Sequence, residues 1–153
     1  MGAWLGIVPT RLPGPARRRC LTSGPAGAGA PDVMLAYQPV GPNVKRFVHL
    51  VETFSGTRFS AVADDEATIR ALSAAAVEAG VTLNLFLDLD GGMHRTGIAP
   101  GERAVHLYRL LSTLPGLRAA GLHMYDGHIH DTDLDVRQKA ADASFTHVQT
   151  MRD

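Results

Sequence analysis

Two kinds of apolar pattern alternate along the chain after residue 31. Short runs of consecutive apolar residues are typical of buried strands, and apolar residues that recur every three or four positions are typical of amphipathic helices. The short runs predict strands at 33–40, 57–64, 81–90 and 117–128. The recurring pattern predicts helices at 42–56, 65–80, 101–116 and 132–153. The pattern therefore predicts four successive strand–helix units.

Residues with special backbone or capping properties mark the ends of the predicted helices. Pro42 suits the first turn of a helix, while Gly56 and Gly80 suit positions just past a helix end. Thr132 or Asp133 is expected to cap the last helix, because either side-chain oxygen can accept a hydrogen bond from a free N–H group.

The strand–helix alternation predicts an α/β fold with parallel strands. Apolar strands joined by helical crossovers form parallel sheets whose two faces are both covered. Two architectures share this pattern: an open doubly wound sheet and part of a (β/α)8 barrel. A complete barrel takes about 250 residues, so four units would form about half of one. Periodicity alone favours the open sheet.

Residues 1–31 lack either pattern. The segment is rich in Pro, Gly, Ala and Arg, and such a composition buries too little apolar surface to offset the entropy lost on ordering. It predicts a disordered tail, or sequence unrelated to the domain at 32–153. A transit-like peptide is the alternative, since Arg17–Arg19 precede any acidic residue.

Composition excludes several classes of partner. The chain has 153 residues, 45% of them hydrophobic, and 15 basic residues balance 15 acidic ones, which suits one globular domain. No basic stripe with interleaved aromatic residues suggests nucleic-acid binding, and no apolar run approaches the roughly 20 residues that span a membrane. The single Cys20 cannot form an internal disulfide, so a cytoplasmic protein is expected.

Polar side chains gather where the predicted strands end. In parallel α/β folds the carboxyl ends of the strands form the edge at which ligands bind. The residues at this edge are Gln38, Asp64, Asp88, Asp90, Arg95, Tyr125, Asp126 and His128. Asp64 can instead serve only as a helix cap, and Gln38 can serve only to satisfy a turn.

Arg95 is the strongest candidate for a functional residue. Gly91 and Gly92 allow a tight turn before it. Asp88 and Asp90 are expected to point to one face of an extended strand, from which a carboxylate can hold the guanidinium in a bidentate pair. A fixed arginine of this kind can donate to a phenolate oxygen or to a carboxylate. A structural salt bridge is the alternative interpretation.

Two histidines near the last strand raise the alternative of a metal-dependent hydrolase. His128 and His130 are two residues apart, and Asp131 or Asp133 is close enough in sequence to add a ligand. A third ligand is not assured by this spacing, so we assign no metal ligands in this chain.

Three stretches together resemble one enzyme family: LAYQPVGPN (35–43), LDLDGGMHRTGI (87–98) and GLHMYDGHIHD (121–131). In this order they resemble D-threonine aldolases and D-serine dehydratases. These enzymes belong to the alanine racemase N-terminal-domain superfamily of fold-type III pyridoxal phosphate enzymes. The resemblance covers 32–153 and implies that the four units are consecutive units of a partial (β/α)8 TIM barrel.

The resemblance also implies roles for individual residues. Arg95 matches the arginine that contacts the phenolic oxygen of pyridoxal 5'-phosphate. Asp88 stands where racemases carry a carbamylated lysine, and we expect its carboxylate to brace Arg95 in a similar way. Tyr125 matches an aromatic position beside the cofactor, and it is expected to orient the substrate. Gln38 and Asp64 are expected in the wall of the cofactor pocket.

For the whole enzyme, the resemblance implies a lyase that cleaves D-3-hydroxy amino acids to glycine and an aldehyde. A divalent metal such as Mn²⁺ and a homodimer are implied for intact relatives. A D-serine dehydratase-like activity is the alternative. The family's Schiff-base lysine is not matched, because Lys45 and Lys139 both fall within predicted helices. The chain is therefore expected to be a fragment, inactive alone and prone to self-association, or a non-catalytic remnant that binds the cofactor.

Overall fold

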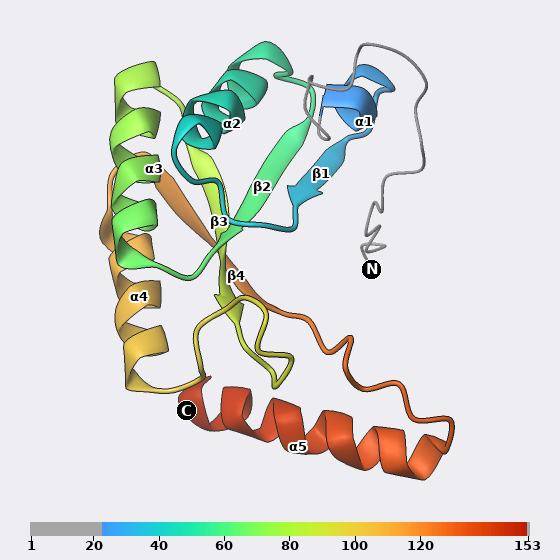
Figure 1. Ribbon diagram of the computed structural model, residues 1–153. Coiled ribbons are helices and arrows are strands. Elements are labelled where there is room, and N and C mark those ends of the chain that lie inside the picture. The colour runs from blue at the N-terminus through green and yellow to red at the C-terminus, as the bar shows by residue number, and fades with distance from the viewer. Residues whose placement is uncertain (1–22, 153) are drawn as a thin grey trace.

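The fold is a four-stranded parallel sheet with helices between consecutive strands. It is seen in a computed structural model that describes residues 23–152 (Figure 1). The strands are β1 (Asp32–Leu35), β2 (Arg58–Ala63), β3 (Leu83–Leu89) and β4 (Leu117–Met124). The helices are α1 (Ser23–Gly27), α2 (Pro42–Thr53), α3 (Glu66–Ala79), α4 (Glu102–Thr113) and α5 (Leu134–Arg152). The eight predicted elements are confirmed; β1 begins one residue earlier than predicted, and the other seven lie within their predicted bounds.

The first and last strands end earlier than predicted. β1 stops at Leu35 instead of residue 40, and β4 stops at Met124 instead of residue 128. Pro39 has no N–H group to donate to a strand ladder, which argues against a strand reaching residue 40, but β1 already ends four residues before it. As a result, Gln38 and Tyr125 lie on the loops that follow these strands and not within the sheet.

Part of the predicted tail is structured. α1 lies within it, Ala26 is buried, and the carbonyl of Ala30 accepts a hydrogen bond from the Thr57 hydroxyl at 2.9 Å. These contacts attach residues 23–31 to the start of the sheet. This part of the predicted tail is therefore packed on the sheet, while the predictions for residues 1–22 lie outside the described residues.

Gly80 and Asp133 are helix caps as predicted, whereas α3 is capped at its start by Asp65 and not by Asp64. The Asp65 carboxylate accepts a hydrogen bond from the Thr68 N–H group at the start of α3, and Gly80 ends that helix with a left-handed backbone (φ 66°). At the start of α5 the Asp133 carboxylate accepts from two backbone N–H groups. Of the two candidates for the last cap, Asp133 is therefore the one used.

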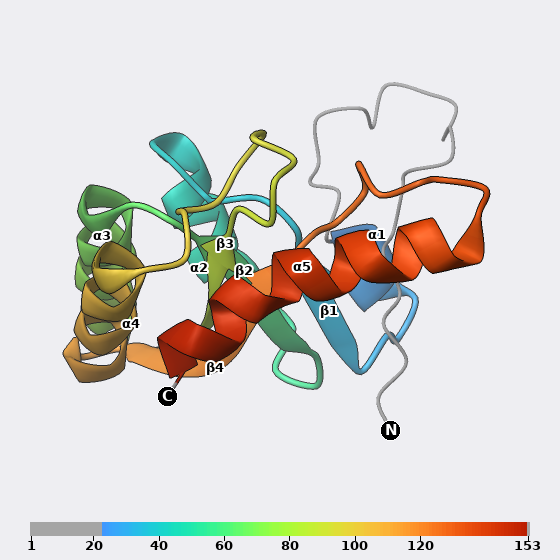
Figure 2. The same cartoon turned by 90° about the horizontal axis from the view of Figure 1, so that it is seen from below.

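The strand order decides between the two predicted architectures. The strands are adjacent in chain order, β1-β2-β3-β4, and every pair is parallel. A doubly wound sheet reverses its strand order and carries helices on both faces, whereas a barrel keeps sequence order with helices outside. Here α2, α3 and α4 lie along one face (Figures 1 and 2). The arrangement is that of consecutive barrel units.

The two faces of the sheet differ in polarity. Leu83, Leu85 and Leu87 of β3 are fully buried in the core beneath the helices. Side chains alternate along a strand, so Asn84 and Asp88 belong to the opposite face. The prediction that the strands are apolar on both faces is therefore wrong for this second face, which carries polar groups.

A bulge shifts the pairing of the last two strands. Leu85 pairs with Ala119, but the next residue, Phe86, pairs with Gly121, which leaves Ala120 as an extra residue in β4. Gly121 has a φ of 137°, a conformation that side chains rarely adopt. A one-residue shift moves side chains to the other face of a sheet, so this bulge decides which residues of β4 share a face with Asp88.

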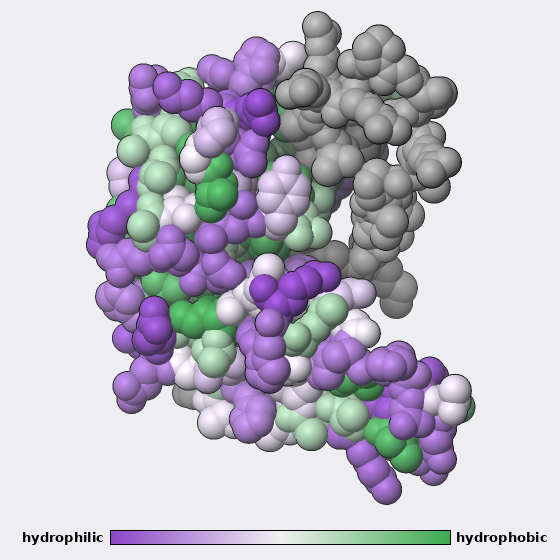
Figure 3. All heavy atoms as spheres, viewed as in Figure 1, coloured by the Kyte–Doolittle hydropathy of each residue, from purple (hydrophilic) through white to green (hydrophobic). Residues whose placement is uncertain are grey.

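The last helix crosses the carboxyl ends of the strands and does not lie along the sheet (Figures 1 and 2). The Ser144 hydroxyl donates to the Gly91 carbonyl at 2.6 Å, and Val148 is buried. Leu134 and Phe145 are 67% and 49% exposed, and apolar surface is visible along α5 (Figure 3). No helix within residues 23–152 has the length and apolarity needed to cross a bilayer.

Candidate functional site

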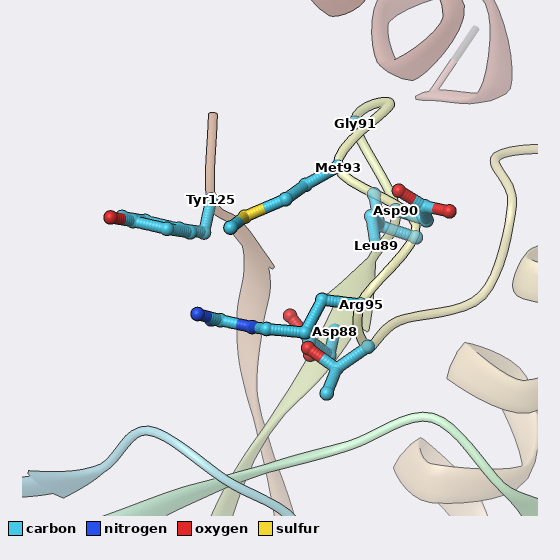
Figure 4. A pocket seen from close by; sticks show the side chains of 8 residues that line it. Asp88, Leu89, Asp90, Gly91, Met93, Arg95 and Tyr125 are labelled. Atoms are coloured by element: carbon cyan, nitrogen blue, oxygen red, sulfur yellow. The ribbon is translucent and has the colours of Figure 1, made fainter. Parts of the chain in front are cut away.

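Arg95 and Tyr125 stack on each other where β3 and β4 end. The guanidinium carbon of Arg95 lies 5.1 Å from the centre of the Tyr125 ring, a cation–π contact. Both residues are exposed, and Met93 points into the same space (Figure 4). The predicted proximity of Arg95 to Tyr125 is therefore confirmed.

A shallow hollow lies beside this pair. Its cavity volume is only about 10 Å³, and its lining includes Asp88, Asp90, Met93, Arg95 and Tyr125 (Figure 4). Ligand pockets typically measure roughly 300–1,000 Å³. The described residues therefore enclose no pocket of ligand size beside this pair.

Asp88 does not brace Arg95 as predicted. The Asp88 carboxylate accepts a hydrogen bond from Nδ1 of His123 at 2.6 Å, and both side chains are largely buried. Within residues 23–152 no carboxylate lies within 4.0 Å of the Arg95 guanidinium. Because a buried carboxylate needs a partner, the imidazole satisfies Asp88, and Arg95 forms no ion pair within residues 23–152.

Asp90 organises the loop after β3 and does not share the face of Asp88. Its carboxylate accepts from the backbone N–H groups of Gly92 and His94, both at 2.9 Å, and contacts the His94 ring at 2.7 Å. The backbone hydrogen bond from His94 lowers the pKa of Asp90 most, and that from Gly92 comes second. Together they bring this pKa from 3.8 to about 2. The prediction that both aspartates face Arg95 is therefore wrong, because β3 ends at Leu89.

Gly97 brings the end of this loop against the sheet. Its φ is 94°, and a Cβ atom there would lie 2.6 Å from the backbone of Leu89 and Asp90. The N–H group of Gly97 donates to the Asp64 carboxylate at 2.7 Å. This close approach fixes the loop that carries Arg95.

Gln38 and Asp64 tie neighbouring loops together. Oε1 of Gln38 accepts from the backbone N–H groups of Asp64 and Asp65, at 2.9 and 3.2 Å. Asp64 in turn holds Gly97. Neither Gln38 nor Asp64 lines the hollow beside Arg95, where both were expected, and their hydrogen bonds join neighbouring loops.

The histidines after β4 form no metal cluster. Nδ1 of His130 contacts the carbonyl oxygen of His128, and the His128 ring lies against Gly92. The Asp131 carboxylate accepts from the N–H group of Asp133. Among residues 23–152, no three His, Cys, Asp or Glu side chains lie close enough together to hold a metal ion. The hydrolase alternative gains no support from this geometry.

His123 is a site residue that the sequence patterns did not single out. Asp88 and His123 are each the next-to-last residue of their strands, β3 and β4. Adjacent parallel strands aligned at their carboxyl ends place such residues side by side on one face. Because both residues are next to last in their strands, the sequence allows the Asp88–His123 pair to be predicted.

The chain's two lysines lie away from the hollow. Lys45 is in α2 and Lys139 is in α5, both exposed at the surface. Neither lines the space beside Arg95 and Tyr125. Their predicted placement within helices is confirmed.

Known proteins resemble this chain in sequence. It is 29% identical over 126 residues to 3-hydroxy-D-aspartate aldolase of Paracoccus denitrificans, which covers 81% of this chain and 32% of that protein. It is 24% identical over 131 residues to D-threonine aldolase of an Arthrobacter species, with 82% and 34% covered. The chain thus spans about a third of the length of these relatives.

Solved structures of related enzymes also resemble this chain. The D-threonine aldolase of Filomicrobium marinum superposes with a TM-score of 0.78 at 30% identity, covering 84% of this chain and 34% of that one. Alanine racemase of Clostridium difficile shares the fold at a TM-score of 0.62 and 15% identity, with 78% and 29% covered. Residues 43–153 match the family described as "Alanine racemase, N-terminal domain". With strand order, helix placement and this match in agreement, the chain belongs to the alanine racemase N-terminal domain family.

Proposed function

We propose that this chain supplies the Arg95–Tyr125 wall of a pyridoxal 5'-phosphate site in an aldolase that cleaves D-3-hydroxy amino acids. The observation that carries the proposal is the stacked pair at the carboxyl ends of β3 and β4. The curated relatives named above act on D-threonine or 3-hydroxy-D-aspartate, as their names state. Both compounds are amino acids of D configuration with a hydroxyl group on the β-carbon.

The residues present fit one side of this cofactor. A pyridoxal ring carries an acidic phenol, and a guanidinium without a carboxylate partner is suited to an anionic oxygen. Arg95 meets that requirement, and its planar group is held against the Tyr125 ring. When bound, pyridoxal phosphate supplies an electron sink for breaking a bond at the α-carbon of an amino acid.

The protein groups have separate roles in this proposal. Arg95 binds the phenolic oxygen and favours its ionised form, because a neighbouring positive charge lowers the pKa of an acid. Tyr125 orients the guanidinium and offers its hydroxyl to the substrate. Asp64 and Gly97 hold the Arg95 loop in place.

We assign neither a metal site nor a catalytic lysine to this chain. Residues 23–152 contain no group of three side chains that could bind the divalent metal implied for intact relatives. We therefore ascribe no step to that metal. Lys45 and Lys139 are exposed on helices and do not line the hollow. We therefore expect no retro-aldol cleavage by the chain alone. A D-serine dehydratase-like activity of the whole protein, a homodimer and a cytoplasmic location stay predictions.

A binding titration tests the proposal. Pyridoxamine 5'-phosphate is the probe, because it has no aldehyde and cannot react with the surface lysines. We expect saturable binding that Arg95→Leu weakens by about ten- to a hundredfold, as expected for losing a hydrogen bond to a charged group. Arg109→Leu, on the exposed surface of α4, is the matched control. Equal affinity in the wild type and Arg95→Leu would contradict the proposal.

Activity is assayed separately. The chain is mixed with pyridoxal phosphate, Mn²⁺ and D-threonine, and acetaldehyde is measured. We expect none. Steady acetaldehyde formation above the protein-free rate would show that the chain supplies its own catalytic groups.

A further inference from the structure

Residues 92–96 form the tip of the loop after β3, and this tip carries the guanidinium of the candidate site. The loop is fixed on either side of the tip. The Gly91 carbonyl accepts a hydrogen bond from the Ser144 hydroxyl at 2.6 Å. The Gly97 N–H group donates to the Asp64 carboxylate at 2.7 Å. These contacts hold the two ends of the loop but leave the tip between them to be held by other groups.

Asp90 supplies the hydrogen bonds that hold the tip. Within residues 23–152, every hydrogen bond made by residues 92–96 ends on its carboxylate. The carboxylate accepts from the N–H groups of Gly92 and His94, both at 2.9 Å, and it contacts Nδ1 of the His94 ring at 2.7 Å. Its side chain is 15% exposed, and its lowered pKa of about 2 keeps it ionised at neutral pH. The imidazole therefore makes the shortest of three contacts that fix this segment.

The backbone of His94 is in a conformation that needs such support. Its φ is 54°, in the left-handed region, which costs free energy for a residue that carries a side chain. It is the one residue other than glycine with a positive φ in the described part of the chain. Because Arg95 follows directly, the conformation of His94 sets the direction in which the arginine side chain leaves the loop.

Arg95 itself is held weakly. Its guanidinium is exposed and stacks on Tyr125 at 5.1 Å, and none of the ion pairs within residues 23–152 includes it (Figure 4). A cation–π contact at an exposed site is weak beside the rotamer freedom of a long arginine side chain. The stack therefore depends on a loop tip that is already ordered.

We propose that His94 is a positioning residue whose imidazole, held by the Asp90 carboxylate, fixes the loop tip and keeps Arg95 stacked on Tyr125. His94 acts on a ligand only through Arg95. The inference rests on the proposed function for the identity of that ligand, whereas the position of the guanidinium can be measured without one.

Three substitutions separate the ring of His94 from its backbone. His94→Gly adopts a positive φ easily but has no ring. His94→Ala loses the ring and also disfavours that φ. His94→Asn keeps an N–H donor near the position of Nδ1, and asparagine tolerates the left-handed region. His49→Ala, at an exposed position of α2, is the matched control.

The first readout is the ring-current shift of Arg95 and needs no ligand. An aromatic ring moves the NMR signals of protons above its face upfield, so the side-chain Hδ and Hε signals of Arg95 report the stack. Tyr125→Leu gives their positions without the ring. We expect His94→Gly and His94→Ala to move these signals more than halfway to the Tyr125→Leu positions. We expect His94→Asn and His49→Ala to keep the wild-type positions.

Urea unfolding separates positioning from a structural role. We expect the midpoint of unfolding to change little in His94→Gly, because the ring is 82% exposed. A wild-type ring-current shift in His94→Gly would overturn the inference, because the ring would then be unnecessary for the stack. Loss of the shift in all three His94 variants, in parallel with a lower urea midpoint, would also overturn it and assign His94 a structural role.

The second readout is the affinity for pyridoxamine 5'-phosphate. We expect His94→Gly to weaken binding several-fold and His94→Asn to bind like the wild type. A lost ring-current shift with unchanged affinity would support the positioning of Arg95 by His94 but contradict the ligand-binding role of Arg95. A wild-type chain that binds no pyridoxamine phosphate would contradict the proposed function, while the ring-current shifts still decide the role of His94.

Discussion

The guanidinium of Arg95 stacks on the ring of Tyr125, 5.1 Å from its centre, although the two residues come from different strand-end loops. The contact joins the loop after β3 to the loop after β4. Both loops lie at the carboxyl ends of a parallel sheet, where α/β folds place their ligands. The stacked pair therefore lies at the edge of the sheet where this kind of fold binds its ligands.

Replacing Tyr125 tests whether the ring positions Arg95. Tyr125→Ala removes the cation–π contact, which is worth about 0.5–1 kcal/mol at an exposed site. We expect affinity for pyridoxamine phosphate to fall by about two- to fivefold, measured by isothermal titration calorimetry. Tyr125→Phe keeps the ring and is expected to bind like the wild type. Equal losses in both variants would assign the effect to the hydroxyl group.

Gly97→Ala tests the close approach of the Arg95 loop to β3. A Cβ atom at this position would lie 2.6 Å from backbone atoms, at a φ of 94° that disfavours alanine. We expect the free energy of unfolding to fall by about 2 kcal/mol or more, measured in urea. Gly56→Ala is the control, because its Cβ atom would meet open space. Similar stabilities of the two variants would show that the loop accommodates the methyl group.

The acid titration of Asp90 tests how tightly the loop is held. Its pKa is lowered to about 2, first by the N–H group of His94 and then by that of Gly92. A depressed carboxylate adds stability that is present above the unfolded pKa of 3.8 and is lost as the pH falls toward 2. We expect its carboxyl ¹³C signal to titrate with a midpoint near 2 by NMR. A midpoint near 3.8 would mean that the loop hydrogen bonds do not form in solution.

The exposed apolar residues of α5 bear on the predicted self-association. Leu134 and Phe145 are 67% and 49% exposed, and β4 pairs with no described strand other than β3. Open strand edges and exposed apolar side chains promote association. We expect sedimentation velocity to show species larger than 16.3 kDa that grow with concentration. Replacing both residues by Ser should reduce association, whereas Val77→Ser on α3 should not. A monomer at all concentrations would contradict this prediction.

The sequence patterns were sufficient for the order and type of the elements. Buried runs such as Leu83–Leu89 and the spacing of Ile69, Leu72 and Ala76 gave strands and helices that the structure confirms. Parallel pairing then brings strand ends together, which is why the proximity of Arg95 and Tyr125 was predictable. The choice of barrel over open sheet came from resemblance, because both architectures share the strand–helix alternation and periodicity alone favoured the open sheet.

The pairing of charges within the site was not predictable from these patterns. Asp88 was expected to hold Arg95, seven residues away, from local spacing and from its match to the carbamylated lysine of racemases. Its actual partner, His123, is 35 residues distant and reaches the same face only through the bulge at Ala120. A single extra residue in a strand leaves little trace in apolar periodicity but reverses which side chains face each other.

The most direct test follows Arg95 itself during ligand binding. With ¹⁵N-labelled arginine, the Nε–H signal of Arg95 is assigned by its loss in Arg95→Leu and then followed by NMR as pyridoxamine phosphate is added. We expect a saturable shift of the Arg95 signal, with the Arg109 signal unmoved and inorganic phosphate causing no comparable change. An Arg95 signal that stays in place while the ligand binds, or that moves equally with inorganic phosphate, would contradict a ring-binding role for this arginine.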